Sequence, residues 1–196
     1  MRAVALAALV ALVAPRAGAQ PAPSFLPSVS AALTRSDAKK DPRVTPGDPT
    51  LRPVAATMMN LHTGEAEALD LSPSEAEATR LRRLLRDRTN WEEHVMAPTV
   101  IATIRAAATA LGGRRVEVVS GYRSDKLNEM LRKKGRHVAQ RSQHVLGNAV
   151  DFRLVGVELP ALLAFVRREH VGGVGAYRRS GFVHVDAGPA RRWRGE

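Results

Sequence analysis

The segment from Ser142 to Asp151, Ser-Gln-His-Val-Leu-Gly-Asn-Ala-Val-Asp, strongly constrains what this chain can fold into. Gly147 can lead the backbone through a turn that a residue with a Cβ atom would resist. Residues 149–154 then alternate, so that apolar side chains share one face of a strand and Asp151 lies on the other. The segment therefore predicts a strand with one apolar, buried face, whose opposite face brings Asp151 beside His144.

A second strand is predicted at residues 182–186, where His184 and Asp186 share one face. If the two strands pair, Asp151 and His184 lie roughly 5 Å apart across the ladder. Together with His144 they would offer two nitrogens and one carboxylate oxygen, which suit Zn²⁺ and leave one position open for water. Structural zinc usually recruits cysteine, and the chain has none. The pattern indicates a catalytic metal site, although other first-row ions would also accept these ligands.

The rest of the chain mixes strand and helix patterns. A β-hairpin is expected from residues 57–62 and 65–69, and a helix is expected to begin with Ser72 as its cap and to bury Leu81, Leu84 and Leu85. The other expected elements are a helix at 98–111, a strand at 116–120, a helix from Ser124 to Gly135, a helix at 160–169 and a glycine-rich strand at 172–177. Glycine in that last strand would let a peptide substrate approach the backbone closely. These patterns predict an α+β domain.

The N-terminal residues have the features of an export signal. Arg2 precedes an apolar run at 3–14, and Ala17-Gly18-Ala19 offers a cleavage site of small residues. The run is shorter than the roughly 20 apolar residues of a spanning helix, although an uncleaved anchor is the alternative. We therefore expect a signal peptide at 1–19, a partly disordered linker at 20–56 and one domain at 57–196. The mature protein is expected to be periplasmic and soluble, without stable membrane insertion.

Several segments in order along the chain resemble the M15-type murein peptidases, and in particular their branch of periplasmic murein endopeptidases. The matching segments are residues 60–65, 84–88, 120–124, 142–151, 172–175 and 182–189. The resemblance implies a mostly antiparallel central sheet with flanking helices, the fold shared by D-Ala-D-Ala carboxypeptidases and the hedgehog signalling domain. It also implies zinc held by His144, Asp151 and His184, and hydrolysis of the peptide cross-links or stem peptides of peptidoglycan.

Three further residues are candidates for the site. In the resembling family, the arginine that matches Arg123 points at the metal, where a guanidinium stabilises an oxyanion or grips a substrate carboxylate. The alternative is a surface arginine paired with Asp125. Tyr122 and Ser142 are expected to line the substrate cleft, while Trp193 either packs the C-terminus or forms part of a substrate wall. The remaining histidines are expected at the surface or at helix ends: His62, His94, His137 and His170.

The general base is the weak point of the pattern. Many relatives carry Glu, Asp or His two or three residues before the last zinc histidine, but this chain has Phe182 and Gly181 there. Asp186 is the local candidate, because it shares a strand face with His184. It would either act as the base or orient the metal-bound imidazole of His184. Both roles stay open at this point.

The charge of the chain bears on its partners. The formal net charge is +11, and removal of Arg2 and Arg16 with residues 1–19 lowers it to +9. A basic exported protein meets anionic polymers, and peptidoglycan stem peptides carry carboxylates. Nucleic acid is disfavoured as a partner because the chain lacks clustered aromatic residues for base stacking. The rival functions are a D,D- or L,D-carboxypeptidase of the same fold and a non-catalytic zinc-containing module that binds murein.

Overall fold

The computed structural model describes residues 54–135, 139 and 141–195. The expected signal peptide, the expected linker up to residue 53 and His137 lie outside the described residues. No helix in the described part of the chain combines the length and the apolar character that a membrane crossing requires.

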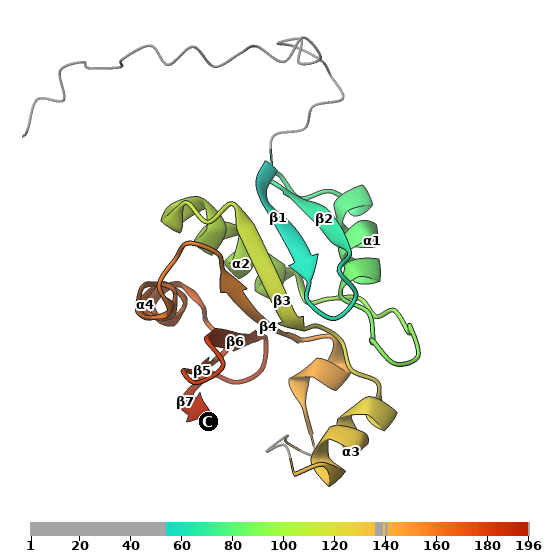
Figure 1. The fold of residues 1–196 in the computed structure, drawn as a ribbon. Coiled ribbons are helices and arrows are strands. Elements are labelled where there is room, and N and C mark those ends of the chain that lie inside the picture. Colours follow the sequence, from blue (N-terminus) through green and yellow to red (C-terminus); the bar gives the residue numbers. More distant parts are fainter. Residues whose placement is uncertain (1–53, 136–138, 140, 196) are drawn as a thin grey trace, which may run out of the picture. The chain divides into compact units, whose positions relative to one another are not determined.

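The described residues form one sheet, four α-helices and a short 3₁₀ helix, η1 (Figure 1). The strands are β1 Val54–Asn60, β2 Ala66–Asp70, β3 Arg115–Ser120, β4 Ala149–Leu154, β5 Gly173–Tyr177, β6 Phe182–Asp186 and β7 Arg191–Gly195. The helices are α1 Glu75–Leu84, α2 Pro98–Leu111, α3 Asp125–Lys133, η1 Gln143–Leu146 and α4 Leu159–Glu169.

The seven strands lie in the order β2-β1-β3-β4-β6-β5-β7. Four neighbouring pairs are antiparallel, and the pairs β1/β3 and β5/β7 are parallel. The predicted α+β fold with a mostly antiparallel sheet is therefore confirmed. The central pair β4/β6 sets Asp151 opposite His184, as the alternation of the two segments predicts.

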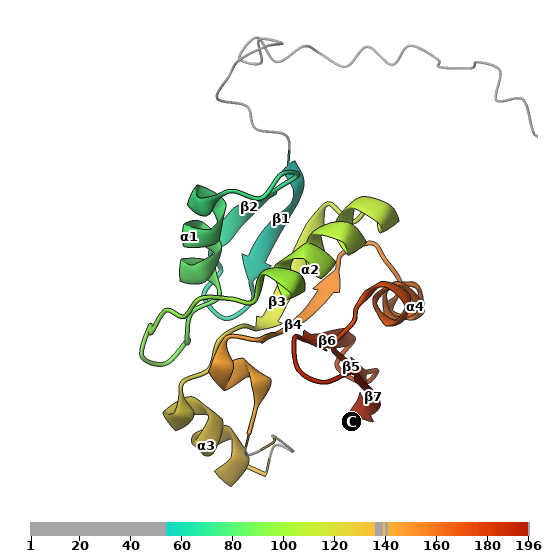
Figure 2. The same cartoon turned by 180° about the vertical axis from the view of Figure 1, so that it is seen from behind.

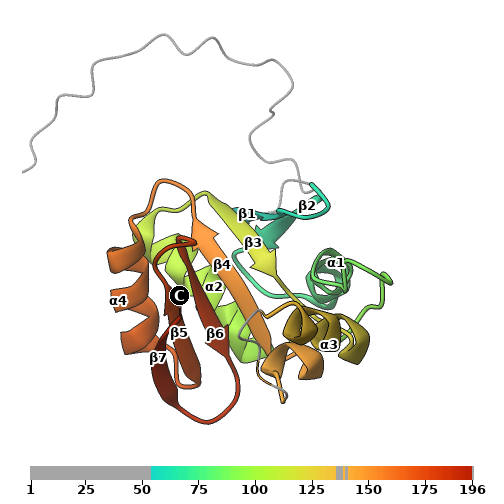
Figure 3. The ribbon, with the colours of Figure 1, turned by 60° about the horizontal axis from the view of Figure 1, so that its bottom comes forward.

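The hydrophobic core lies between one face of this sheet and the helices α2 and α4. Seen from behind, α2 runs across the sheet with α4 beside it (Figure 2). Phe152 of β4, Val183 of β6, Ile104 of α2 and Val166 of α4 are all fully buried in this core. Because side chains alternate along a strand, Asp151 and His184 lie on the opposite face. Figure 3 shows α3 beside the end of the sheet at which β4 begins.

Several element boundaries differ from the prediction by one to three residues, and two of them bear on the organisation of the chain. Helix α1 is capped by Ser74 instead of Ser72, because the Ser74 side chain accepts a hydrogen bond from the backbone N–H of Glu77 at 3.1 Å. The first strand begins at Val54, three residues before the expected start of the domain at 57. The helix expected at 98–111 is confirmed with the same bounds, and Gly112 ends it in the left-handed conformation.

Strand β7 was not predicted. Its residues, Arg-Arg-Trp-Arg-Gly, show no alternation of apolar and polar side chains, and it lies at the edge of the sheet beside β5. Its pairing places Arg191 beside Gly173 and Trp193 beside Gly175.

Candidate metal centre

Three buried side chains converge on the sheet face that lies away from the core. His144 comes from η1, Asp151 from β4 and His184 from β6, and their relative exposures are 3%, 5% and 7%. The His184 Nδ1 atom lies 2.8 Å from Asp151 Oδ1, and His144 Nε2 lies 3.3 Å from both His184 Nδ1 and Asp151 Oδ2. One potential ligand atom from each residue lies within 4.8 Å of the others. The structure therefore brings together the three residues expected to bind zinc.

The turn that carries His144 is built by its immediate neighbours. The Ser142 hydroxyl accepts a hydrogen bond from the His144 backbone N–H at 3.3 Å and so caps η1. Gly147 ends η1 with a φ of +67°, and a Cβ atom there would collide with the Val95 carbonyl oxygen. Ser142, expected to line the cleft, is itself buried and shapes the turn that positions His144.

The outer nitrogen of each imidazole has a hydrogen-bond acceptor. His144 Nδ1 lies 2.7 Å from the carbonyl oxygen of Gly121, and His184 Nε2 lies 2.8 Å from Asp186 Oδ2. When these nitrogens donate, the lone pairs of His144 Nε2 and His184 Nδ1 face Asp151. Metal-bound histidines commonly have such partners, which fix the tautomer and the ring orientation. The donor set and its surroundings therefore fit a divalent zinc ion.

Asp186 is held on both of its oxygens. Oδ1 accepts from the backbone N–H of Gly188 at 2.8 Å and from Arg191 Nη1 at 3.1 Å. Oδ2 accepts from Arg191 Nη2 at 2.8 Å in addition to His184 Nε2. Burial disfavours the charged carboxylate, but the hydrogen bonds from His184 and Gly188 outweigh it and lower the pKa of Asp186 to about 2. Asp186 thus stays charged as the acceptor for the outer nitrogen of His184.

Arg123 contacts the centre and does not pair with Asp125. Its Nη2 lies 2.8 Å from Asp151 Oδ2, and its Nε donates to the Ser120 hydroxyl at 2.8 Å. The guanidinium side chain is only 12% exposed. The expectation that Arg123 faces the candidate metal site agrees with this geometry.

The electrostatics of the cluster favour a bound cation. Burial, followed by the positive charge of Arg123, lowers the pKa of His144 to about 4, so its Nε2 lone pair is available at neutral pH. Burial also opposes protonation of His184, but the hydrogen bonds to Asp151 and Asp186 outweigh it and raise the pKa of this imidazole. For Asp151, burial opposes ionisation, yet His144 and His184 hold its pKa well below the usual range. A metal ion between these atoms would replace a proton on His184 Nδ1.

The glycine-rich strand β5 makes room for side chains of the protein itself. A Cβ atom at Gly175 would lie 2.5 to 2.8 Å from the indole of Trp193, and one at Gly173 would collide with the carboxylate of Asp186. The indole ring lies 5.0 Å from the His184 ring, and its Nε1 lies 3.4 Å from the Tyr177 hydroxyl. The expectation that these glycines admit a substrate is replaced by a packing role, because side chains of β6 and β7 fill the space beside them.

Tyr122 packs against His94 and Glu92. Its ring stacks on His94 with centroids 4.8 Å apart, and its hydroxyl donates to Glu92 Oε1 at 3.0 Å. The side chain is 7% exposed. Tyr122, expected to bind substrate, thus packs the loop that precedes α2 against the segment that carries Arg123.

Comparison with known proteins shows the family to which the chain belongs. A family model described as "Peptidoglycan L,D-endopeptidase MepK" matches residues 49–193. The chain is 38% identical over 152 residues to the "Probable peptidoglycan L,D-endopeptidase MepK" of Haemophilus influenzae, covering 74% of this chain and 82% of that protein. It is 36% identical over 149 residues to the "Peptidoglycan L,D-endopeptidase MepK" of Escherichia coli K12, with the same coverage of each chain. No solved structure gives a significant match. The chain therefore belongs to the M15 peptidase family that is described by the name peptidoglycan L,D-endopeptidase MepK.

Proposed function

We propose that this protein is a zinc-dependent murein endopeptidase that hydrolyses peptide bonds in the cross-links or stem peptides of peptidoglycan. The observation that carries the proposal is the convergence of His144, Asp151 and His184 on one sheet face, with an acceptor for the outer nitrogen of each imidazole. The relatives named above are peptidoglycan L,D-endopeptidases, which supports the substrate and the type of bond.

His144 Nε2, Asp151 and His184 Nδ1 would hold the zinc ion. Zinc supplies a Lewis acid that polarises the scissile carbonyl and lowers the pKa of a water molecule. Arg123 lies against Asp151 and is nearly excluded from solvent, so its guanidinium both fixes that carboxylate and places positive charge where an oxyanion develops. Removal of this charge is therefore expected to lower turnover more than metal affinity.

Asp186 is proposed to orient His184 and not to act as the general base. The imidazole of His184 lies between Asp186 and the proposed metal position, because its Nε2 faces Asp186 while its Nδ1 faces Asp151. A general base must come within hydrogen-bond reach of the water that it deprotonates. Both Asp186 oxygens already have donors within 3.1 Å, and the side chain is fully buried. These contacts match the carboxylate that commonly supports a metal-bound histidine.

Residues 1–19 are proposed to direct export, so that the domain that begins with β1 at Val54 acts as the peptidase in the periplasm. Sequencing the N-terminus of the exported protein tests this proposal. A mature chain that starts near Gln20 supports it, and a mature chain that starts at Met1 refutes it.

Digestion of purified cross-linked muropeptide dimers, with mass identification of the products, tests the activity. The zinc-loaded protein is expected to convert dimers into monomers, and His144→Ala is the control without a complete metal site. Release of terminal D-alanine alone would identify a carboxypeptidase instead. Bound zinc without any hydrolysis would identify a murein-binding module.

A further inference from the structure

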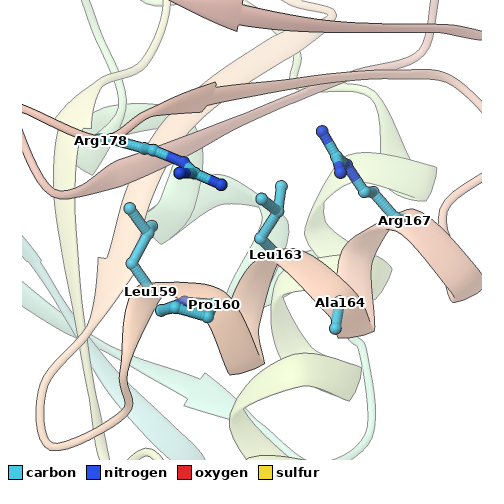
Figure 4. Close-up of a pocket in the computed structure, with 6 residues that line it drawn as sticks. All are labelled: Leu159, Pro160, Leu163, Ala164, Arg167 and Arg178. Carbon is cyan, nitrogen blue, oxygen red and sulfur yellow. The ribbon is translucent and has the colours of Figure 1, made fainter.

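A pocket outside the metal centre lies on α4 and the turn between β5 and β6. It has a volume of about 470 Å³ and is lined by Leu159, Pro160, Leu163, Ala164, Arg167 and Arg178. Figure 4 shows Leu163 between the two arginines and Leu159 beneath Arg178, with both arginines extending over the same side of α4. The pocket therefore combines an apolar floor with a positive charge on each side.

The two arginines of the pocket have no carboxylate partner among the described residues. Other arginines nearby do: Arg168 pairs with Glu169, and Arg191 pairs with Asp186. A third arginine, the exposed Arg194, lies on the neighbouring strand β7. The next residue of β7, Gly195, pairs with Tyr177, which directly precedes Arg178. Positive charges that gather on one surface without carboxylate partners in the protein favour the binding of an anionic ligand.

This pocket is distinct from the metal centre. Along β7, Arg191 and Trp193 contact Asp186 and His184 on one face of the sheet. Arg192 lies on the other face, where its guanidinium donates to backbone carbonyl groups at the end of α4, including that of His170 at 2.9 Å. The pocket and the metal centre thus lie on opposite sides of the sheet, and one extended polymer network can contact both.

We propose that this pocket binds an acidic stem peptide of peptidoglycan, at a place other than the one being cut. Arg167 and Arg178 would hold its carboxylates, while Leu159 and Leu163 would contact its small alkyl side chains. This inference rests on the proposed function and assigns it a second substrate-binding surface. A lipid acyl chain fits this pocket less well, because it needs a broad exposed apolar surface. None of the large exposed apolar residues in the described part of the chain lines the pocket.

Co-sedimentation of the protein with purified peptidoglycan sacculi tests the proposal, in the cold and before measurable digestion. The pocket variant is Arg167→Gln/Arg178→Gln. The matched control is Arg83→Gln/Arg114→Gln, which removes the same charge from two exposed arginines, one on α1 and one between α2 and β3. Exposed ion pairs each contribute a small factor, so we expect the pocket variant to bind sacculi about fivefold more weakly and the control to stay within about twofold of wild type. Thermal unfolding of both variants checks that they are folded.

Equal losses in the two variants would show that net charge alone drives binding and would overturn the inference. Unchanged binding of the pocket variant would also overturn it. A third contrary result is pocket-dependent binding to vesicles of phosphatidylglycerol and phosphatidylcholine without pocket-dependent binding to sacculi. Cleavage of soluble muropeptide dimers by the wild type tests the proposed function separately, and the pocket variant is expected to cleave them at the wild-type rate.

Discussion

Asp186→Asn separates the two roles that the sequence leaves open for this residue. Asparagine keeps the shape of the side chain, but one of its two terminal atoms is a donor. All contacts of the Asp186 carboxylate come from donors, namely His184 Nε2, the backbone N–H of Gly188 and two nitrogens of Arg191. At least one of these contacts must therefore become repulsive, and the charge that attracts Arg191 is lost.

The expected change in zinc affinity follows from the position of Asp186, which accepts the hydrogen bond from the outer nitrogen, Nε2, of His184. Loss of an outer partner of a metal ligand lowers metal affinity about 10- to 100-fold, or about 1.4 to 2.7 kcal/mol. We expect the zinc Kd of Asp186→Asn to rise by this factor, with kcat at saturating zinc reduced less than about tenfold. Loss of a general base would instead lower kcat by about 100- to 10,000-fold and leave zinc affinity intact.

Zinc affinity is measured by competition with a chromophoric chelator, and kcat is measured on muropeptide dimers at saturating zinc. Asp125→Asn, in the exposed first turn of α3, serves as the matched control and is expected to change neither quantity. An unchanged zinc Kd together with a loss of kcat greater than about 100-fold would refute the orienting role.

The same carboxylate predicts how the metal-free protein responds to acid. The pKa of Asp186 falls from 3.8 to about 2 on folding, which corresponds to about 2 kcal/mol of stability. A group whose pKa is lowered by folding stabilises the fold above its unfolded pKa, so this contribution is lost as the pH falls from about 4 to about 2. Urea unfolding of chelated protein over that range is expected to show a smaller loss of stability in Asp186→Asn than in wild type. Equal losses in the two proteins would contradict the assignment.

Three further predictions concern the centre and its neighbours. Arg123→Gln, which removes the positive charge, is expected to lower kcat by about 100-fold while zinc content stays near that of wild type, and full activity would contradict a role for this charge. The raised pKa of His184 stabilises the chelated protein below pH 6.5, and this stability is lost as the pH rises through the folded pKa. The Tm of chelated protein is therefore expected to fall as the pH rises beyond 6.5 and zinc to reverse the fall; a Tm independent of pH would be the contrary result. Tyr122→Phe removes only the hydrogen bond to Glu92, so it should cost about 1 kcal/mol in urea unfolding and leave KM unchanged, whereas a raised KM would restore Tyr122 as a substrate contact.

The candidate metal ligands could be predicted because local rules determine their positions. Alternation sets Asp151 and His184 on the face of each strand opposite the valines, and Gly147 marks the turn that returns the chain past His144. The pairing of β4 with β6 is the single non-local step, and two compatible strands suffice to suggest it.

Contacts that depend on distant pairing could not be predicted in this way. Arg191 reaches Asp186 only because β7 pairs with β5 at the sheet edge, where an arginine-rich strand carries no apolar signal. Tyr122 is expected from the sequence to line the cleft, yet it and Arg123 are neighbours in an extended segment, where adjacent side chains point in opposite directions. Its ring packs on His94, a contact set by the course of the loop before α2.

The central claim is that His144, Asp151 and His184 bind one zinc ion, and measurement of zinc stoichiometry tests it most directly. The wild-type protein is stripped with chelator, reloaded with zinc, freed of excess metal and analysed for metal, alongside His144→Ala and His184→Ala variants whose folding is checked by circular dichroism. About one zinc ion per wild-type chain, with little or none in the folded variants, is the predicted result. A wild-type chain that binds no zinc, or variants that retain zinc as tightly as wild type, would contradict it.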